Sequence, residues 1–406
     1  MLRAKGLVIV SDFHVIVIGA GLGGLALAQG LVRAGIQVTV HERDAALTSR
    51  RQGYRLHIDA YGRDALVTLL PPPLARLFLA TAGVPNARFT LLDDQLNQVL
   101  TQDADETGSS DFAVDRLVLR QILLAGIEDA VKFGNELQHY EAVPGGRVGA
   151  HFTDGSQVHG DVLVAADGAN SAVRHQYLPH ARIVDTGVWQ LYGAIPLTDR
   201  TRPLFDDRMF GIFTAITGPE RTYLGVAPVE FPESPQRAAA RLASGTTLLP
   251  VSDYMTCSFG ARREWFGRSA EELRAMSGER LHAIMAEAVR TWHPRVREIV
   301  AACEPASMFA VPLRSSVPIT PWETTPVTLL GDAIHAMSPA AGAGACTALR
   351  DASHLTTALT KAAAGRDLID ALREYESAMI DYGFTAVRTG ADNGQRILGQ
   401  DPLPIA

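Results

Sequence analysis

The sequence is poor in cysteine and has no clusters of like charge, and both shortages exclude classes of protein. Its 406 residues contain only three cysteines, Cys257, Cys303 and Cys346, which are widely spaced and form no CxxC pair. This pattern excludes a disulfide framework and a zinc site of the CxxC type, and it favours a reducing cytoplasm. The net charge of -7 is spread without basic blocks, so neither nucleic acid nor an anionic membrane surface is an expected partner.

Long apolar runs are also missing. No segment reaches the roughly 20 consecutive apolar residues that a membrane-spanning helix needs. The first residues, MLRAKGLVIVSDFHVIVIGAG, have a basic tip and an apolar run, but Asp12 and His14 interrupt the run, so we expect no export signal. A hydrophobic content of 47% over 406 residues predicts a globular chain of two joined domains with a small-molecule ligand. No metal-ligand spacing and no Ser-His-Asp order is recognisable, so no metal is expected.

What the sequence does contain is a glycine-rich turn in a setting typical of nucleotide binding. HVIVIGAGLGGLALAQGLVRAGIQVTVHERD predicts a buried strand, a helix and a second strand. Gly19, Gly21 and Gly24 form GxGxxG: the first glycine permits a tight turn, the second a close approach of phosphate, and the third helix–strand packing. Glu42 ends the second strand, where a carboxylate can bind a ribose. The unit predicts a dinucleotide at the helix N-terminus.

Two later segments indicate which dinucleotide is bound. The glycine fingerprint occurs once, which disfavours an enzyme with two complete nucleotide sites. VLVAADGANSAVR is an apolar strand that ends in Asp167-Gly168 and continues to Ser171 and Arg174. GDAIHAMSPAAGAGACTALRDA places Asp332 after another apolar strand and Gly342-Ala343-Gly344 at the start of a predicted helix. A helix start without side chains favours a bound negative charge.

These three motifs, in this order, resemble the class A FAD-dependent monooxygenases, the p-hydroxybenzoate hydroxylase-like family. The resemblance covers nearly the whole chain, includes Glu42-Arg43, and is nearest in type to salicylate hydroxylase and the tetracycline-inactivating monooxygenases. It implies FAD as the cofactor, NADPH or NADH as a transient reductant, and O2 as a second substrate.

The resemblance also implies FAD contacts, residue by residue. Asp332 would accept a hydroxyl of the ribityl chain, and the backbone from Pro339 to Ala345 would lie against the flavin ring. Two alternatives stay open: Asp332 as a helix cap, and Arg116 as a salt-bridged arginine for which Arg120 substitutes. The implied contacts are Gly19, Gly21, Gly24, Glu42, Arg43, Arg116, Asp167, Asp332, Pro339, Gly342, Gly344 and Ala345.

The loop ERDAALTSRRQGYRLHI aligns with the corresponding loop of the tetracycline-inactivating enzymes. On that resemblance Arg50 would contact NADPH or NADH. His57 takes the position of an acid beside the flavin, or else faces solvent. Arg51 and Arg55 add positive charge that would attract the phosphates of NADPH.

The sequence departs from the family pattern at the second glycine loop. Ala343 and Cys346 stand where glutamine and asparagine are usual, so backbone contacts carry over and side-chain contacts do not. Cys346 would lie near the flavin as a small packing residue and not as a redox thiol.

From about residue 183 the pattern changes to short apolar and aromatic strands, which predict an antiparallel sheet. Residues 88–100 predict a hairpin that joins this sheet, and residues 279–294 predict a helix closed by Pro294. Aromatic residues that alternate in a sheet can build a core or line a pocket. The candidates for a substrate pocket over the flavin are Gln190, Tyr192, Phe210 and Phe213.

The expected fold class is α/β: a Rossmann-like FAD-binding domain of the GR2 type, interleaved with an antiparallel-sheet substrate domain and followed by a bracing helix. The run Pro71-Pro72-Pro73 is expected to be a stiff connection, and the bracing helix is expected at 367–390. The predicted FAD-binding segments are 12–75, 105–180 and 305–366, the substrate-domain segments are 76–104 and 181–304, and the helix and tail are 367–406.

The function that the resemblance implies is hydroxylation of an aromatic, enolic or polyketide-like molecule through a C4a-hydroperoxyflavin. No catalytic side chain is identified, because the cofactor carries the chemistry. Secondary metabolism or antibiotic modification is the expected setting, and a monomer or weak homodimer the expected assembly. Two alternatives stay open: an FAD-retaining cyclase or binding scaffold without redox turnover, and a flavin-linked reductase or desaturase.

Overall fold

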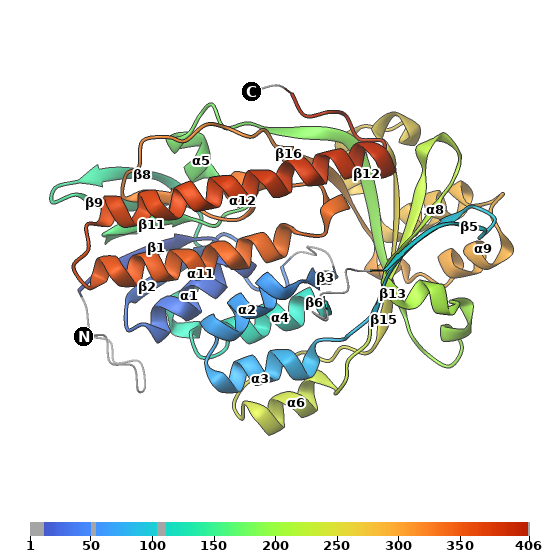
Figure 1. Ribbon diagram of the computed structural model, residues 1–406, viewed down its shortest axis with the longest axis horizontal. Helices are drawn as coiled ribbons and strands as arrows, with labels where there is room; N and C mark the ends of the chain where they lie inside the picture. The colour runs from blue at the N-terminus through green and yellow to red at the C-terminus, as the bar shows by residue number, and fades with distance from the viewer. Residues whose placement is uncertain (1–11, 50–53, 104–110, 405–406) are drawn as a thin grey trace.

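The computed structural model describes residues 12–49, 54–103 and 111–404, and its helices join two main sheets (Figure 1). The first sheet is parallel and has five strands. Its strands β1 and β11 are buried along their whole length, as expected for a parallel sheet that is covered on both faces. In spatial order they are β17 (Val327–Leu329), β11 (Val162–Ala165), β1 (His14–Ile18), β2 (Gln37–Glu42) and β7 (Val131–Phe133).

Two layers cover this sheet. On one face lie α1 (Leu22–Arg33) and α11 (Gly344–Ala363), which pack against each other, and α12 (Leu368–Ile397) runs beside α11 (Figure 1). An antiparallel sheet of β8 (Leu137–Val143), β9 (Arg147–Phe152) and β10 (Gln157–Gly160) contacts the strands from the other side. The carboxyl ends of β1 and β17 therefore open next to the N-termini of the helices on the first face.

The second sheet has seven strands. β4 and β5 form the predicted hairpin, but β4 pairs parallel with β13, so the expectation of a purely antiparallel sheet is wrong at this pair. A long connection, not a tight turn, joins these two strands, and it leaves their relative direction free. The order is β16 (Phe309–Ser316), β12 (Ile183–Pro196), β15 (Tyr254–Arg262), β14 (Tyr223–Val229), β13 (Gly211–Thr217), β4 (Asn86–Asp93) and β5 (Gln98–Asp103).

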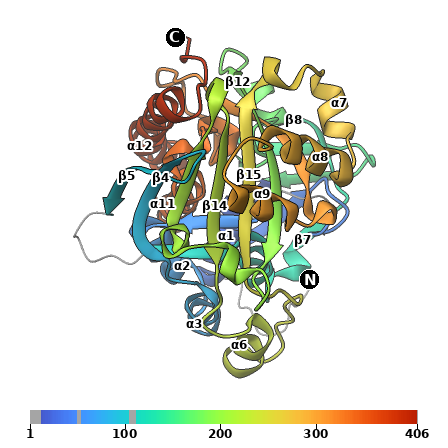
Figure 2. The ribbon, with the colours of Figure 1, turned by 90° about the vertical axis from the view of Figure 1, so that its right-hand side faces the viewer.

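The two faces of the seven-stranded sheet have different neighbours. Trp189, Leu191 and Ile195 point to the outer face and form a buried core with α8 (Gly278–Ala288) and α9 (Pro294–Ala301) (Figure 2). Because side chains alternate along a strand, Gln190 and Tyr192 point to the opposite, inner face. That inner face is turned toward the parallel sheet.

Three predicted segments differ from the structure in their bounds or in their conformation. The helix at 279–294 stops at Ala288, and Pro294 begins α9, since proline fits the first turn of a helix and has no N–H to leave unpaired. For the same reason Pro72 begins helix α3 (Pro72–Thr81), so the proline run is not a separate stiff connection. The bracing helix α12 continues to Ile397.

The remaining elements connect the sheets. β3 and β6 form a two-stranded ribbon between them. The division into domain segments stays a prediction, and α3 runs across its first boundary at residue 75. These elements are α2 (Ala60–Leu69), α4 (Arg116–Leu124), α5 (Ala172–Tyr177), α6 (Pro235–Leu242), α7 (Ala270–Ala275), α10 (Asp332–His335), β3 (Arg55–Ile58) and β6 (Phe112–Asp115).

Candidate cofactor and substrate site

Two glycines of the N-terminal turn are required by packing. Gly19 has a φ of 107°, and a Cβ there would lie 2.3 Å from the carbonyl oxygen of Ala166. A Cβ at Gly24 would lie 2.1 Å from the carbonyl oxygen of Gly19. Both positions therefore need glycine whether or not a ligand is bound.

Gly21 is different because its neighbourhood is open. The nearest atom to a Cβ there would be the Ala166 oxygen, 3.9 Å away. Gly21 is the N-cap of α1, whose described first turn has no side-chain cap and no acidic residue. Exposed N–H groups at a helix start attract anions, and the space over Gly21 lets a phosphate approach them. This cradle fits the pyrophosphate of a dinucleotide.

Side chains around this turn hold it in place. The Glu42 carboxylate accepts hydrogen bonds from the backbone N–H of Ala20 at 2.8 Å and of Asp44 at 2.9 Å. Arg120 is buried and donates to the carbonyl oxygens of Ala20 at 2.9 Å and Leu47 at 3.2 Å. Sequence reasoning treated Arg120 only as a substitute for Arg116, but it fixes the glycine turn.

The other predicted contacts near the first turn have separate positions. Arg116 begins α4, which Asp115 caps by accepting from the N–H of Val118 at 2.8 Å, as predicted. Asp167 follows β11, and burial raises its pKa. One of its carboxylate oxygens accepts from the N–H of Ala172, while the other is buried without a partner among the described residues and fits a cofactor hydroxyl. Arg43 is exposed.

Asp332 begins helix α10 at the carboxyl end of β17. The N-cap is Gly331, with a φ of 61°, so the alternative that Asp332 caps a helix is wrong. Asp332 is exposed, and its side chain forms no hydrogen bond with the described residues. Arg174 is buried and donates to the carbonyl oxygen of the next residue, Ala333, at 2.9 Å. Asp332 is therefore a free carboxylate on an anchored turn.

The second glycine loop leads directly into α11. The short 3-10 turn η7 (Pro339–Ala341) is followed by Gly342, with a φ of 64°, and α11 starts at Gly344. The described first turn of α11, which includes Ala345, has no side-chain cap and no acidic residue. A Cβ at Gly344 would meet nothing nearer than Met337, 3.7 Å away. This second bare helix start suits the negative charge of a reduced flavin ring.

His57 lies beside the second loop. A Cβ at Gly342 would come within 3.2 Å of its Nδ1 atom, and its Nε2 atom lies 3.1 Å from a carboxylate oxygen of Asp111. Cys346 donates to the carbonyl oxygen of His57 and accepts from the N–H of Asp59, both at 3.3 Å. Burial raises the pKa of the Cys346 thiol, so the thiol ties β3 to α11 and remains protonated.

Of the three arginines predicted to contact NADPH or NADH or to attract its phosphates, only Arg55 lies in the described part of the chain. Arg50 and Arg51 lie outside the described residues. Arg55 is half-buried: its Nε donates to the carbonyl oxygen of Pro228 in β14 at 3.1 Å, and burial lowers its pKa to about 10. The expectation that Arg55 adds positive charge that attracts the phosphates of NADPH stays a prediction.

The inner face of the seven-stranded sheet brings three of the predicted substrate residues onto one surface. Tyr192 stacks on Phe309 at 5.4 Å between ring centroids. Burial raises the pKa of Tyr192 to about 12, although the nearby positive charge of Arg116 lowers it. Phe213 lies over Gly225, where a Cβ would come within 2.4 Å of its ring. Gln190 is buried, and its side-chain oxygen has no partner among the described residues.

Sequence reasoning missed Tyr223. Tyr223 and Gln190 are both paired with Gly260 in the sheet, and the Tyr223 ring lies over this glycine. Its hydroxyl is buried without a partner among the described residues. The residue packs in a small cluster with Ala340 of η7, in the second glycine loop. Alternation in RTYLGVAPV places Tyr223 on the same face as two small residues, Gly225 and Ala227, and this was the available signal.

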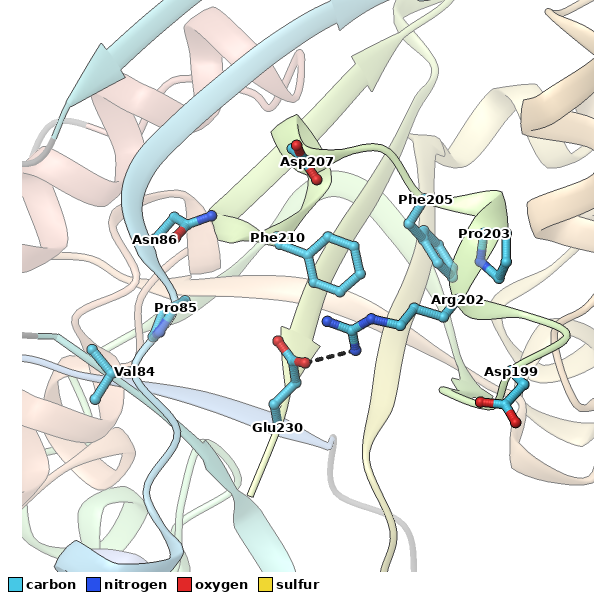
Figure 3. Close-up of a pocket in the computed structure, with 10 residues that line it drawn as sticks. All are labelled: Val84, Pro85, Asn86, Asp199, Arg202, Pro203, Phe205, Asp207, Phe210 and Glu230. Carbon is cyan, nitrogen blue, oxygen red and sulfur yellow. Dashed lines mark hydrogen bonds and ion pairs between the residues drawn. The ribbon is translucent and has the colours of Figure 1, made fainter. Parts of the chain in front are cut away.

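The structure does not bring Phe210 to this surface. It packs against the outer core and lines a separate pocket of about 620 Å³ (Figure 3). There the Arg202 guanidinium lies 4.6 Å from the Phe210 ring centre and pairs with Glu230 at 2.8 Å. The sequence could not separate Phe210 from Phe213, because a 3-10 turn that ends at Phe210 interrupts the alternation.

Two negative findings apply to the described ranges. No group of three or more histidine, cysteine or acidic side chains there is placed to hold a metal ion. None of the helices in these ranges is both long and apolar enough to cross a membrane.

Known proteins match the chain over nearly its whole length. Residues 12–59 and 118–388 match the family described as FAD binding domain. A dual O-methyltransferase/FAD-dependent monooxygenase of Cercospora beticola is 30% identical over 410 residues, which cover 96% of this chain and 47% of that protein. An FAD-dependent urate hydroxylase of Klebsiella pneumoniae is 28% identical over 377 residues, covering 90% of this chain and 85% of that protein.

A solved structure agrees with this match. A Photorhabdus luminescens protein assigned to the FAD-containing monooxygenases superposes with a TM-score of 0.83 at 29% identity, covering 95% of this chain and 99% of that one. The chain spans about half the length of the dual-function relatives that it matches, 47% of one and 41% of another.

Proposed function

Because the chain belongs to the FAD binding domain family, we propose that it is an FAD-dependent monooxygenase that uses NADPH or NADH and O2 to hydroxylate an aromatic or enolic small molecule. The predicted family and its cofactor FAD are confirmed. The reductant, the oxygen chemistry, the substrate and a role in secondary metabolism or antibiotic modification are parts of the proposal.

One observation carries it. The bare N-termini of α1 and α11 belong to helices that pack side by side, so two sites for negative charge lie on the same edge of the parallel sheet. An elongated cofactor with a pyrophosphate at one end and a ring that becomes anionic at the other suits this arrangement. The free Asp332 carboxylate follows the neighbouring strand β17, where it would accept a ribityl hydroxyl.

When bound, FAD would supply the redox chemistry with NADPH or NADH and O2, and the residues of this chain would bind and orient it. The start of α11 would stabilise negative charge on the ring, and His57 with Asp111 would close one side of it. The inner face of the seven-stranded sheet would exclude water over the ring through Tyr192, Phe213 and Phe309.

The substrate would bind between this face of the sheet and the second glycine loop, which includes η7. Tyr223 and Gln190 have polar atoms that lack partners among the described residues, and buried polar groups are costly unless they are hydrogen-bonded. A planar molecule with a hydroxyl or carbonyl at its edge would satisfy them. Burial raises the pKa of Tyr223 well above its usual value, so its hydroxyl would act as a donor.

The first test is a spectrum of the FAD-bound protein under anaerobic conditions. We expect NADPH or NADH to bleach the flavin band, and one compound of a phenolic and polyketide panel to accelerate the bleaching. After O2 is admitted, that compound should gain one oxygen atom. A flavin that never bleaches would support the non-redox alternative, and bleaching without oxygen in the product would support a reductase or desaturase.

Tyr223→Phe tests the substrate side. Loss of one hydrogen bond to substrate should lower kcat/KM by about tenfold. Phe210→Leu is the control, because Phe210 lies on the outer face, and it should leave kcat/KM unchanged. Equal effects of the two substitutions would contradict the proposed location of the substrate.

A further inference from the structure

A single buried carboxylate gathers three segments around the turn that carries Asp332. Asp351 lies in α11 and is completely buried. One of its oxygens accepts from the N–H of Gly331 at 2.7 Å and lies 2.6 Å from Nε2 of His335. The other accepts from the hydroxyl of Tyr382 in α12 at 2.6 Å.

Two of these bonds hold the two ends of α10. Gly331 is the N-cap of this helix and His335 is its last residue, so Asp332 stands between two residues that share one acceptor. The Asp332 side chain itself is exposed and is not part of the network. Asp351 therefore holds the backbone on both sides of Asp332 and does not bind the Asp332 carboxylate itself.

The third bond joins the C-terminal helix to the same carboxylate. The His335 ring lies directly against α12, since a Cβ at Gly383 would be 2.8 Å from its Cδ2 atom. Tyr382, the preceding residue, is covered by the Arg350 guanidinium at 4.0 Å from the ring centre. A displacement of α12 would therefore move two of the three partners of Asp351, Tyr382 and His335.

Charge strengthens the arrangement. Burial lowers the pKa of His335, but the charge and hydrogen bond of Asp351 outweigh burial, and Asp332 adds to them, so the net direction is upward. The charges of Asp351 from α11 and of Asp332 from its own helix act on the ring, and the Tyr382 hydroxyl of α12 donates to the same Asp351 carboxylate. The other ring nitrogen, Nδ1, is buried without a partner among the described residues.

We propose that Asp351 is a positioning residue for FAD: it holds both ends of the Gly331–His335 turn, presents Asp332 to the ribityl chain, and makes cofactor affinity depend on helix α12. The proposal rests on the FAD site of the family and not on the oxygenation reaction. Its tests need neither reductant nor substrate.

The experiment is a titration of the FAD-depleted protein with FAD, followed by flavin fluorescence. Asp351→Asn should raise the Kd for FAD by about tenfold or more, since both ends of the turn lose a charged acceptor. Tyr382→Phe removes one bond and keeps the ring, so a rise of roughly two- to fivefold is expected.

Glu376→Gln is the matched control. Glu376 is a buried acid of α12 that accepts from the hydroxyls of Thr324 at 2.7 Å and Thr328 at 2.9 Å, in the strand β17 and the segment before it and not in the turn itself. It should lower thermal stability but leave the Kd for FAD within about twofold. If Asp351→Asn and Glu376→Gln raise the Kd equally, the positioning role is wrong.

The pH profile gives a readout that a merely structural role would not move. In the wild type, the Kd for FAD should rise as pH increases through the raised pKa of His335, because the pair with Asp351 weakens. His335→Gln should flatten this dependence. If Asp351→Asn does not fold, Tyr382→Phe decides: an unchanged Kd would overturn the proposal, whereas tight FAD binding without oxygenation would overturn only the proposed function.

Discussion

The two helix starts proposed to hold the cofactor are built in different ways. At α1, Gly19 and Gly24 fit against nearby backbone, and a Cβ at either would lie within 2.3 Å of a carbonyl oxygen. At α11, the loop and the turn that carries Asp332 are held by side-chain hydrogen bonds that link different elements, among them those of Arg174, Asp351 and Cys346. The first start is a close fit between backbone atoms, to which Glu42 and Arg120 add hydrogen bonds, whereas the second depends on side-chain hydrogen bonds.

The difference sets what a substitution does. At the start of α1, an added methyl group would clash with backbone at Gly19 or Gly24, whereas at Gly21 it would fill the space that a phosphate needs. At the second, each support adds one or two hydrogen bonds, so its loss weakens the site by a graded amount. Four predictions test this contrast.

The largest effect is expected for Gly24→Ala. Its Cβ would lie 2.1 Å from the Gly19 oxygen, so α1 must move away from β1. Overpacking of this kind costs about 2–4 kcal/mol in the free energy of unfolding. Thermal unfolding of the FAD-depleted protein measures it, and a melting temperature equal to that of the wild type would show that the turn is not a rigid fit.

Gly21→Ala should separate binding from folding within the same turn. The nearest protein atom to the new Cβ is 3.9 Å away, so the unfolding free energy of the FAD-depleted protein should stay within about 0.5 kcal/mol. The methyl group would occupy the phosphate approach and raise the Kd for FAD about a hundredfold, or ~2.8 kcal/mol. If the Kd for FAD equals that of the wild type, the pyrophosphate does not bind at Gly21.

A pH dependence should exist at the second start and depend on His335. Its pKa is raised in the folded protein, so the stabilisation is fully present below the unfolded value of about 6.5 and is lost as pH rises through the folded value. Unfolding free energies of the wild type and His335→Gln should therefore converge as pH increases above about 6.5. A constant difference across that range would mean that His335 does not titrate with folding.

The smallest effect is expected for Cys346→Ala. It removes the hydrogen bonds through which the Cys346 thiol links α11 to β3, which should lower the free energy of unfolding by about 1 kcal/mol. FAD affinity should change by less than about threefold, because in the proposed site the contacts from α11 to the ring would be made by backbone. Cys346→Ser is the matched variant that keeps a donor. A large loss of flavin reduction in either variant would give the thiol a direct role.

The contrast also explains what the sequence could predict. Strands β1, β2 and β11, the first glycine turn and the Asp115 cap follow from local patterns, and all are observed. The Asp351 network was not predictable, because its members come from three elements, α10, α11 and α12, and no spacing in the sequence relates them. Tyr223 and Phe210 were misjudged for a related reason: which face of a sheet lies over the cofactor is a property of the packed domains.

The order of the parallel sheet has a consequence for synthesis of the protein. Its strands come from residues 14–18 and 37–42, then 131–133 and 162–165, and finally 327–329, and the turn after the last strand needs Tyr382. During translation the glycine turn emerges first, but the site that it serves stays incomplete until the ribosome has released most of α12. Folding dominated by such distant contacts is slow. We expect FAD to be captured only after the chain leaves the ribosome, and nascent chains that end before β17 to leave β11 as an unpaired edge strand exposed to chaperones.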